Sequence, residues 1–280
     1  ILLKNVNNNI EIKTIEVLGN IWNSYENFKP WDKSLNDKEQ SCSNYRVWCN
    51  NKWSKIKRVI RHKTNKKIYR INTHCGVVDV TEDHSLLNKE GSIIKPNNCI
   101  INETKLLHSY PKMNDTKPPN LTDIIDILDG YDSIDRNEAE KKAFIYGMFY
   151  GDGSCGYYNC PSGNKYTWAI NNQDLKLLEM CKKYLKDLYG DETDFKILET
   201  MKSSGVRKLI PKGNIKYMVN KFRPLFYSKT KHKTIPNEIL NDNYNIRLNF
   251  FIGYYFANGA KEMNSKIKHI NFSNKGKIGS

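Results

Sequence analysis

A nine-residue stretch occurs twice in this chain, and the repeat limits what the chain can fold into. The first copy reads IYGMFYGDG at residues 145–153, and the second reads FIGYYFANG at residues 251–259. In each copy two small residues lie four positions apart, so they share one face of a helix: Gly147 with Gly151, and Gly253 with Ala257. Small residues at that spacing let two backbones approach closely. We therefore expect the two helices to pack together about a pseudo-twofold axis.

Each copy ends in an Asx residue followed by Gly, at Asp152-Gly153 and at Asn258-Gly259. The final Gly predicts a helix C-cap in the left-handed conformation. An Asp at the negative end of the helix dipole is locally unfavourable, which is expected where a function such as metal binding compensates. Packing of the two helices would bring Asp152 and Asn258 together at one end of the pair.

This pattern resembles the LAGLIDADG (dodecapeptide) motif of homing endonucleases, and two copies in one chain resemble the monomeric, pseudo-symmetric members. Two ordinary buried helices with Gly at their ends are the alternative, which a second matching copy makes the weaker one. The resemblance implies that Asp152 and Asn258 are catalytic and bind Mg²⁺ beside the scissile phosphates of double-stranded DNA, because hard cations take oxygen ligands. Since Asn258 carries no charge and cannot act as a base, both an active enzyme and an impaired or nicking enzyme stay open.

The charge of the chain predicts a polyanionic partner. The formal net charge is +15 and the pI is near 9.3, although a basic, well-solvated surface is the simpler alternative. Seven Cys without regular spacing do not indicate a disulfide framework, so we expect an intracellular, reducing compartment. A virus-encoded protein would also fit this expectation. No signal peptide or transmembrane run is evident in the sequence.

Residues 1–107 have the pattern of a β-rich domain. The segment 10–17 alternates apolar and polar residues, 57–62 and 67–71 flank a turn and predict a hairpin, and 77–81 and 92–95 predict two further strands. Residues 108–137 contain Pro, Gly, Asn and Asp clusters and predict a connecting segment, with one short helix around 121–128.

Residues 138–280 change to mixed helix and strand. Helices are expected at 138–150, 173–188, 215–226, 236–240 and 247–257, with strand pairs within 157–170 and 195–209. A basic, aromatic two-stranded ribbon fits a DNA major groove. Lysine side chains add phosphate contacts, although each one taken singly is more often a solvated surface residue. The DNA-binding residues predicted on this basis are Lys165, Tyr166, Trp168, Lys202, Arg207, Lys208, Lys229, Lys231 and Lys233.

A second motif lies in the first domain, where Thr81 and His84 form a Thr-x-x-His sequence after a predicted strand. It looks like the corresponding block of inteins, and residues 61–87 are similar to inteins of viral family-B DNA polymerases. A structural histidine is the alternative. The resemblance implies an acyl shift in which His84 and Thr81 are catalytic, with His74 a weaker candidate. The host protein would then be a DNA polymerase that supplies the flanking exteins.

Together these resemblances imply an α+β chain: an all-β Hint-type horseshoe splicing domain at 1–107, then an α/β LAGLIDADG endonuclease domain of order αββαββα with its second half truncated. Ile1 is not a splicing nucleophile and Gly279-Ser280 is not a splice junction, so we expect a fragment that lacks both junctions and does not splice as written. A DNA-binding module without catalysis, and a freestanding intron-associated endonuclease or RNA maturase, remain as alternatives.

Overall fold

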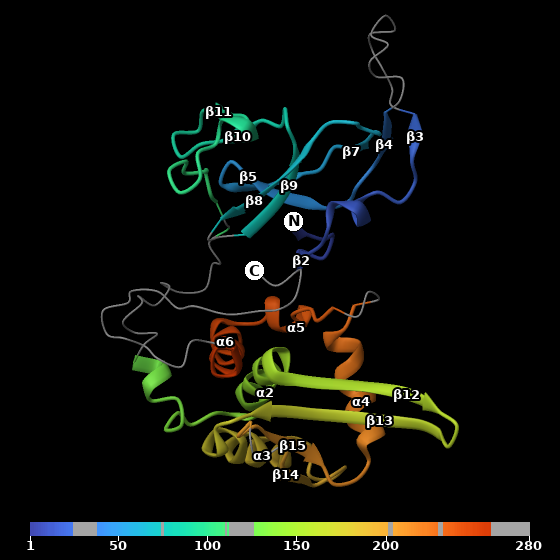
Figure 1. Ribbon diagram of the computed structural model, residues 1–280, viewed down its shortest axis with the longest axis vertical. Coiled ribbons are helices and arrows are strands. Elements are labelled where there is room, and N and C mark those ends of the chain that lie inside the picture. The colour runs from blue at the N-terminus through green and yellow to red at the C-terminus, as the bar shows by residue number, and fades with distance from the viewer. Residues whose placement is uncertain are drawn as a thin grey trace, which may run out of the picture. The chain divides into compact units, whose positions relative to one another are not determined.

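The computed structural model describes residues 1–24, 38–73, 76–109, 111, 126–200, 204–228 and 232–258. The chain divides into two compact units, Ile1–Met113 and Asn114–Gly279, which we call the first and the second unit (Figure 1). Within the described ranges, no helix has both the length and the apolar character needed to cross a membrane.

The first unit consists of short antiparallel strands. They form the sheets β2-β1-β5-β6, β3-β4-β7, β8-β9 and β10-β11. A small cluster of buried residues, Leu3, Leu18 and Val59, holds the first part of the unit together. The elements are β1 (Leu2–Lys4), β2 (Ile10–Ile12), η1 (Ile15–Leu18), β3 (Asn23–Ser24), β4 (Glu39–Ser41), β5 (Arg46–Cys49), β6 (Lys52–Lys55), β7 (Val59–Arg61), β8 (Ile68–Thr73), β9 (Gly76–Thr81), β10 (Leu86–Leu87), β11 (Ile93–Ile94) and η3 (Pro96–Asn98).

Two local expectations for the first unit are wrong. The strand expected over 10–17 ends at Ile12, and the 3-10 turn η1 follows and buries Leu18. The hairpin expected between 57–62 and 67–71 does not form, because β7 pairs with β4 and β8 pairs with β9. The β8–β9 ladder joins six residue pairs, from Ile68 with Thr81 to Thr73 with Gly76. Strand pairing depends on such cross-strand contacts more than on a nearby turn signal.

The second unit mixes helices with an antiparallel sheet, which confirms the predicted α+β class. The sheet has the order β12-β13-β15-β14. Up to α4 the elements follow the predicted order αββαββα. They are α2 (Glu138–Asp152), β12 (Gly153–Cys160), β13 (Gly163–Asn172), α3 (Leu175–Tyr189), β14 (Phe195–Glu199), β15 (Arg207–Pro211), α4 (Ile215–Phe226), α5 (Asn237–Leu240) and α6 (Tyr244–Asn258). The short helix expected around 121–128 falls mostly outside the described residues, although 126–129 are helical.

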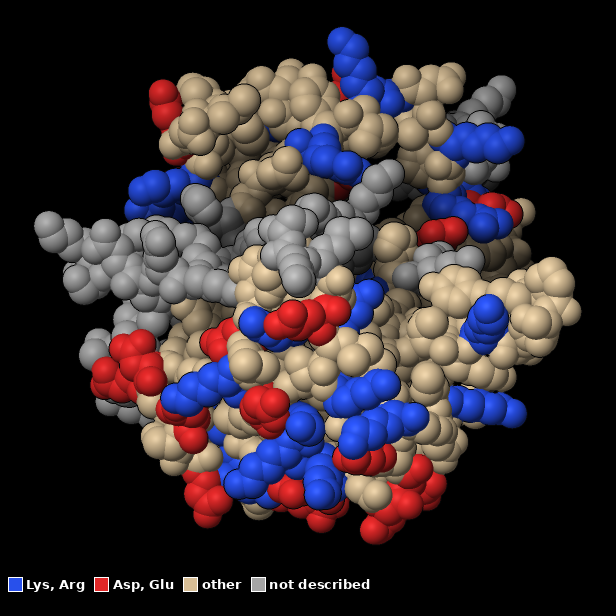
Figure 2. Space-filling model, turned by 60° about the horizontal axis from the view of Figure 1, so that its bottom comes forward, with Lys and Arg blue, Asp and Glu red and all other residues tan. Residues whose placement is uncertain are grey.

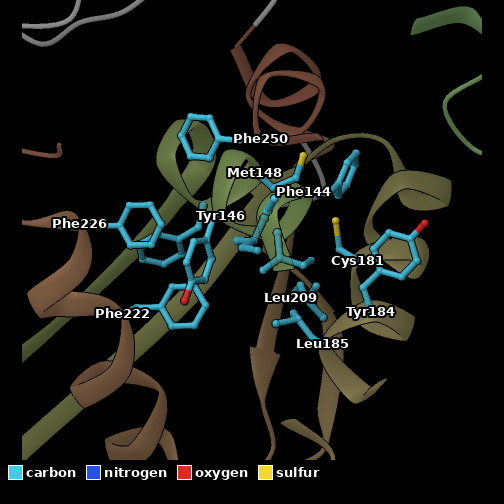
Figure 3. Close-up of a cluster of buried hydrophobic side chains, with 14 of the residues drawn as sticks. Phe144, Tyr146, Met148, Cys181, Tyr184, Leu185, Leu209, Phe222, Phe226 and Phe250 are labelled. Atoms are coloured by element: carbon cyan, nitrogen blue, oxygen red, sulfur yellow. The ribbon is translucent and has the colours of Figure 1, made fainter. Parts of the chain in front are cut away.

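Helix α2 lies at the centre of the second unit. It begins in a capping box, in which the Asn137 side chain accepts from the Glu140 amide while the Glu140 carboxylate accepts from the Asn137 amide. Seven consecutive residues from Ala143 to Phe149 are buried, so the helix is surrounded on nearly all sides. Figure 3 shows Phe144, Tyr146 and Met148 of this run among side chains of the neighbouring helices and strands. Tyr146, for example, packs edge-on against Phe222 and Phe226 of α4, with ring centroids 5.5 and 5.2 Å away.

The helices of the second unit cover one face of its sheet. Trp168 on β13 stacks on Phe149 of α2 and meets Phe222 of α4 edge-on. Ile170 on β13 is paired with Leu209 on β15, and both are fully buried on the same face. Because successive side chains of a strand point to opposite faces, the residues that alternate with these lie on the opposite face, which we call helix-free because none of the described helices covers it.

Candidate functional site

The two repeated segments pack against each other as α2 and α6. A Cβ atom on Gly147 would lie 2.0 Å from the carbonyl oxygen of Phe250, and one on Gly253 would lie 2.1 Å from that of Phe144. Each contacted carbonyl belongs to the residue three positions before the glycine of the other helix. The two contacts are therefore related by a pseudo-twofold axis, as the repeat predicts. Only glycine fits at either position, because any side chain would meet backbone.

The C-terminal ends of α2 and α6 also touch. A Cβ on Gly151 would lie 2.4 Å from Cβ of Ala257 and 3.1 Å from Nδ2 of Asn258. The amide of Asn258 therefore lies against Gly151 in the last turn of α2. Gly151 immediately precedes Asp152 in the sequence. Both Asx side chains predicted as catalytic belong to this one end of the helix pair.

Asp152 is held by two asparagines at the end of β13. Asn172 donates from Nδ2 to Oδ2 of Asp152 at 3.1 Å, and Asn171 donates to the main-chain oxygen of Asp152 at 3.0 Å. Asn172 is 5% exposed, and its Nδ2 also lies 3.5 Å from the carbonyl oxygen of Phe256 in α6. Asn172 therefore touches both motif helices at their ends. Asn172 was not among the predicted site residues, and its signal in the sequence is an Asn-Asn pair directly after the apolar run 168–170.

Lys233 caps the C-terminal end of α2. Its Nζ donates to the carbonyl oxygens of Phe149 at 2.8 Å, Tyr150 at 3.0 Å, Gly151 at 3.3 Å and Gly153 at 2.6 Å. A cation there offsets the negative end of the helix dipole beside Asp152. Burial lowers the pKa of Lys233 to about 8, against the opposing effect of the Asp152 charge. The prediction that Lys233 contacts DNA phosphate is wrong, because its ammonium group is taken up by these carbonyls.

Gly153 does not adopt the predicted left-handed cap. Its φ of −79° and ψ of 157° are extended, and it begins β12 directly. A Cβ at this position would lie 2.3 Å from the ring of Phe149. The glycine is therefore required by a close approach and not by its backbone angles, and Lys233 rather than a glycine turn satisfies the end of α2.

Apart from Lys233 and Trp168, the predicted DNA-binding residues fall into three groups. Lys165 on β13 and Lys208 on β15 are exposed and lie on the helix-free face of the sheet. Tyr166 faces the helices, half-buried, with the Lys216 ammonium 5.9 Å from its ring centroid. Arg207 is half-buried at the sheet end, where its Nη1 donates to the Gln173 carbonyl. The remaining predicted lysines, Lys202, Lys229 and Lys231, lie outside the described residues.

Trp168 cannot contact DNA. It is 2% exposed, and its ring lies 5.6 Å from that of Phe149 and 5.2 Å from that of Phe222. The one-residue alternation of β13 places it on the helix side while Lys165 and Thr167 point away. The exposed residues of the helix-free face, which we call the open face, are Ser154, Tyr158, Lys165, Thr167, Lys196, Leu198 and Lys208.

Charges of both signs are interspersed on the side of the molecule shown in Figure 2. Ion pairs of the second unit join Lys141 with Asp187 at 2.7 Å, Lys212 with Asp194 at 2.5 Å, and Lys176 with Asp132. Exposed pairs of this kind add little stability. The net positive charge is therefore not gathered into one patch on that side.

The first unit places Thr81 and His84 in one tight turn after β9. The amide of His84 donates to the Thr81 carbonyl at 3.0 Å, and the His84 side chain is exposed. The carboxylate between them, Asp83, pairs with Lys66, and it also accepts a hydrogen bond from the Thr81 hydroxyl. These contacts lower the pKa of Asp83 to about 2. His74 lies outside the described residues.

Comparison with known proteins links the chain to DNA polymerase sequences. It is 47% identical over 282 residues to a protein named DNA polymerase from Acanthamoeba polyphaga mimivirus, and the alignment takes 99% of this chain but 15% of that protein. It is 25% identical over 234 residues to a DNA polymerase of Thermococcus hydrothermalis, across 78% of this chain and 12% of that protein. The chain thus spans about one-seventh or less of the length of the curated relatives that it matches. No family model matches the sequence.

Among solved structures, the chain overlays on the homing endonuclease I-DmoI in complex with DNA and Mn. The TM-score is 0.33 with 17% identity, over 45% of this chain and 65% of that one. A complex of I-DmoI with DNA and Ca overlays with a TM-score of 0.32 and 15% identity. Overlays at these scores do not establish a shared fold, so the architecture of the second unit stands on its own element order and contacts.

The described residues contain no cluster of three or more His, Cys, Asp or Glu side chains that could hold a metal ion. Asp152 and Asn258 together offer one carboxylate and one amide oxygen at the ends of α2 and α6. Mg²⁺ commonly binds through one or two carboxylates together with phosphates of the substrate. This donor set fits a cation shared with a bound phosphodiester, and not a cation enclosed by protein alone.

Proposed function

We propose that this chain is part of a protein-splicing element of a DNA polymerase, and that its second unit is a LAGLIDADG-type, site-specific DNA endonuclease. The observation that carries the proposal is the reciprocal packing of Gly147 and Gly253. This contact brings the two repeated segments together and leaves Asp152 and Asn258 at one end of the pair. A helix pair with an Asx residue at the same end of each member can present oxygen ligands to both strands of a duplex.

In this proposal Asp152 supplies the one negative charge that the motif helices bring to the site. Asn172 orients the Asp152 carboxylate through Oδ2, and in this proposal that carboxylate and the Asn258 amide oxygen are the two protein ligands of Mg²⁺. Bound Mg²⁺ would stabilise the charge that develops on the cleaved phosphate. The ammonium group of Lys233 keeps the end of α2 electrically balanced beside Asp152.

The open face of the sheet is the proposed DNA surface. Lys165, Lys196 and Lys208 are exposed on three different strands of that face. No helix in the described part of the second unit packs on this face, and a two-stranded β-ribbon fits the major groove. Its lysines would supply phosphate contacts, so affinity would fall as salt increases.

The proposed host follows from the comparison with the mimivirus protein. Nearly the whole chain aligns, yet it accounts for 15% of a protein named DNA polymerase, as an element inserted into a polymerase would. In this proposal Thr81 and His84 act at the upstream junction of that element: the histidine protonates the leaving nitrogen of the strained peptide. The turn that joins the two residues supports this assignment.

A plasmid-nicking assay tests the endonuclease. The full chain is incubated with Mg²⁺ and a supercoiled plasmid that carries the uninterrupted polymerase gene, and a plasmid without that gene serves as the DNA control. Asp152→Asn keeps the shape of the side chain and removes its charge, and Asp191→Asn does the same at an exposed loop position. We expect nicking by wild type and Asp191→Asn, and its loss in Asp152→Asn. Equal nicking by all three proteins would refute the assignment of Asp152.

A DNA-binding module without cleavage is the second candidate, and the neutral Asn258 favours it. In that case wild type would bind the polymerase-gene DNA with or without Mg²⁺ and leave it intact. Gel-shift measurements on the same DNA separate the two candidates. Binding that is unchanged by Asp152→Asn, together with no nicked product, would assign the binding module.

A further inference from the structure

A buried polar contact joins the segment before α2 to α6. Arg136 is 3% exposed and Asn249 is 5% exposed. Nε of Arg136 donates to Oδ1 of Asn249 at 2.6 Å. Nδ2 of Asn249 donates in turn to the carbonyl of Asn245 at 3.0 Å, which turns the amide oxygen toward the arginine. The contact is far from Asp152, because Asn249 lies nine positions before Asn258 on α6.

The other contacts of the Arg136 guanidinium are made by residues outside α6. Nη1 donates to the carbonyl of Tyr131 at 2.9 Å and to the hydroxyl of Tyr184 on α3 at 3.1 Å. The guanidinium carbon lies 4.8 Å from the ring centroid of Phe144 on α2. Nη2 is buried and has no hydrogen-bond partner in the described part of the chain. A charge desolvated to this degree depends strongly on each acceptor that it retains.

The acceptor supplied by α6 has no counterpart on α2. Asn249 lies two residues before the second repeated segment, and the residue two positions before the first segment is Ala143. Ala143 is fully buried and offers no side-chain acceptor. The glycine contacts of the two helices are reciprocal, whereas the contact of Arg136 is not. This polar contact is therefore a point at which the pseudo-symmetry of the pair is broken.

We propose that the Arg136–Asn249 contact selects pairing of α2 with α6 in one chain over pairing of α2 with α2 of a second copy. The glycine faces alone would allow either pair, because Gly147 and Gly151 match Gly253 and Ala257 in position. In an α2–α2 pair each Arg136 would face Ala143, and both Nε donors would be buried without an acceptor. A single buried polar residue specifies the partner in this way in coiled coils, where the wrong pairing leaves a polar group unsatisfied.

The test is the oligomeric state, measured by light scattering over a concentration series and by subunit exchange between two differently tagged copies. Asn249→Ala makes α6 resemble α2, so the two pairings become equally poor for Arg136. We expect this variant to dimerise at concentrations at which wild type stays monomeric, with a dimer dissociation constant lower than that of wild type by about tenfold or more. Arg136→Met removes the buried charge, so it is expected to form the dimer as well while remaining folded.

Two further variants separate partner selection from a general structural role. Tyr184→Phe removes an Arg136 acceptor that stays beside the arginine in either pairing, so it is expected to lower the melting temperature and leave the chain monomeric. Asn249→Asp keeps the acceptor and is also expected to stay monomeric. Monomeric Asn249→Ala and Arg136→Met, or a wild-type dimer, would overturn the proposal, as would dimerisation of all four variants. No DNA is needed, so the outcome does not depend on the proposed nuclease.

Discussion

The side-chain amide of Asn258 lies against Gly151, the residue that precedes Asp152. A Cβ at position 151 would come within 3.1 Å of Nδ2 of Asn258 and 2.4 Å of Cβ of Ala257. The contact places the ends of two segments 106 residues apart side by side, and Asn172 reaches both of them. One carboxylate and one amide thus occupy positions that the repeat makes equivalent. The two ends of the helix pair therefore differ in charge, because α2 ends in a carboxylate and α6 ends in a neutral amide.

Asn258→Asp is expected to increase DNA cleavage. A second carboxylate would add the negative charge that the α6 end lacks and would bind Mg²⁺ more tightly. We expect the nicking rate to rise by about tenfold and linear product to appear, because a tenfold rate change corresponds to about 1.4 kcal/mol in the barrier. The two adjacent carboxylates should lower the melting temperature without Mg²⁺, and Mg²⁺ should restore it. An unchanged rate with intact DNA binding would contradict the prediction.

Gly147→Ala is expected to destabilise the second unit severely. The new methyl group would lie 2.0 Å from the Phe250 carbonyl, so α2 and α6 would have to separate. We expect a loss of about 3 kcal/mol in the free energy of unfolding, measured by urea denaturation. Gly213→Ala is the matched control, because a Cβ there meets nothing within 4 Å. Similar losses in the two variants would argue against close packing of the helix pair.

Lys233 is expected to make stability depend on alkaline pH. Its pKa in the folded chain is about 8, below the ordinary value of 10.5, so the unfolded chain binds more protons between these values. The free energy of unfolding attributable to Lys233 therefore rises as pH increases from about 8 to 10.5, and is lowest below that window. Denaturation curves of wild type and Lys233→Met across this range measure the difference. Parallel pH profiles would show that the lysine is not buried as described.

Lys165→Ala and Lys208→Ala are expected to weaken DNA binding. Each loses one phosphate contact, so the slope of log affinity against log salt should fall by about 1 for each variant. Trp168→Phe should leave that slope unchanged and lower the melting temperature, because the indole packs among Phe149, Phe195 and Phe222. Lys182→Ala, on the exposed side of α3 with Glu179, is the control for charge alone. A salt slope unaffected by Lys165 and Lys208 would move the DNA surface away from the open face.

Lys66→Met is expected to raise the pKa of Asp83. Lys66 is the largest cause of the lowered value of about 2, and the Thr81 hydroxyl is the second. The stabilisation from Asp83 is present above its ordinary pKa of 3.8 and is lost as pH falls through about 2. Carboxyl NMR titration should place Lys66→Met closer to 3.8, with a smaller increase for Thr81→Val. A pKa unaffected by Thr81→Val would mean that the turn leaves the threonine hydroxyl unengaged.

Helices could be predicted from the sequence because their signals are local. The apolar spacing of α3 and the Asp174 side chain that caps it both lie within a few residues of the helix that they define. The predicted helix at 215–226 coincides with α4. In the first unit the nearest turn signal was misleading, since β7 pairs with a strand some twenty residues earlier. Strand partners are chosen by packing between distant segments, which periodicity does not reveal.

In the candidate site, too, some residues could be predicted from the sequence and others could not. Asp152 and Asn258 could be selected from their positions in a repeat. Trp168 and Lys233 were assigned to the surface because aromatic and basic residues in a basic chain resemble a nucleic-acid ribbon. In the structure Trp168 packs in the core and Lys233 caps α2. Neither use has a sequence signature, because the core partners and the carbonyl oxygens come from segments far away in the chain.

The sequence by itself determined that two glycine-faced helices would pair and that their ends would carry an acid and an amide, since small-residue spacing and helix periodicity are properties of neighbouring residues. Only the tertiary structure decided which groups surround that acid: Asn172 from β13, Lys233 from the segment before α5, and the Arg136–Asn249 contact at the other end of the pair. These contacts join residues 20 to 113 positions apart. Such contacts follow from how the whole chain packs, and no local pattern specifies them.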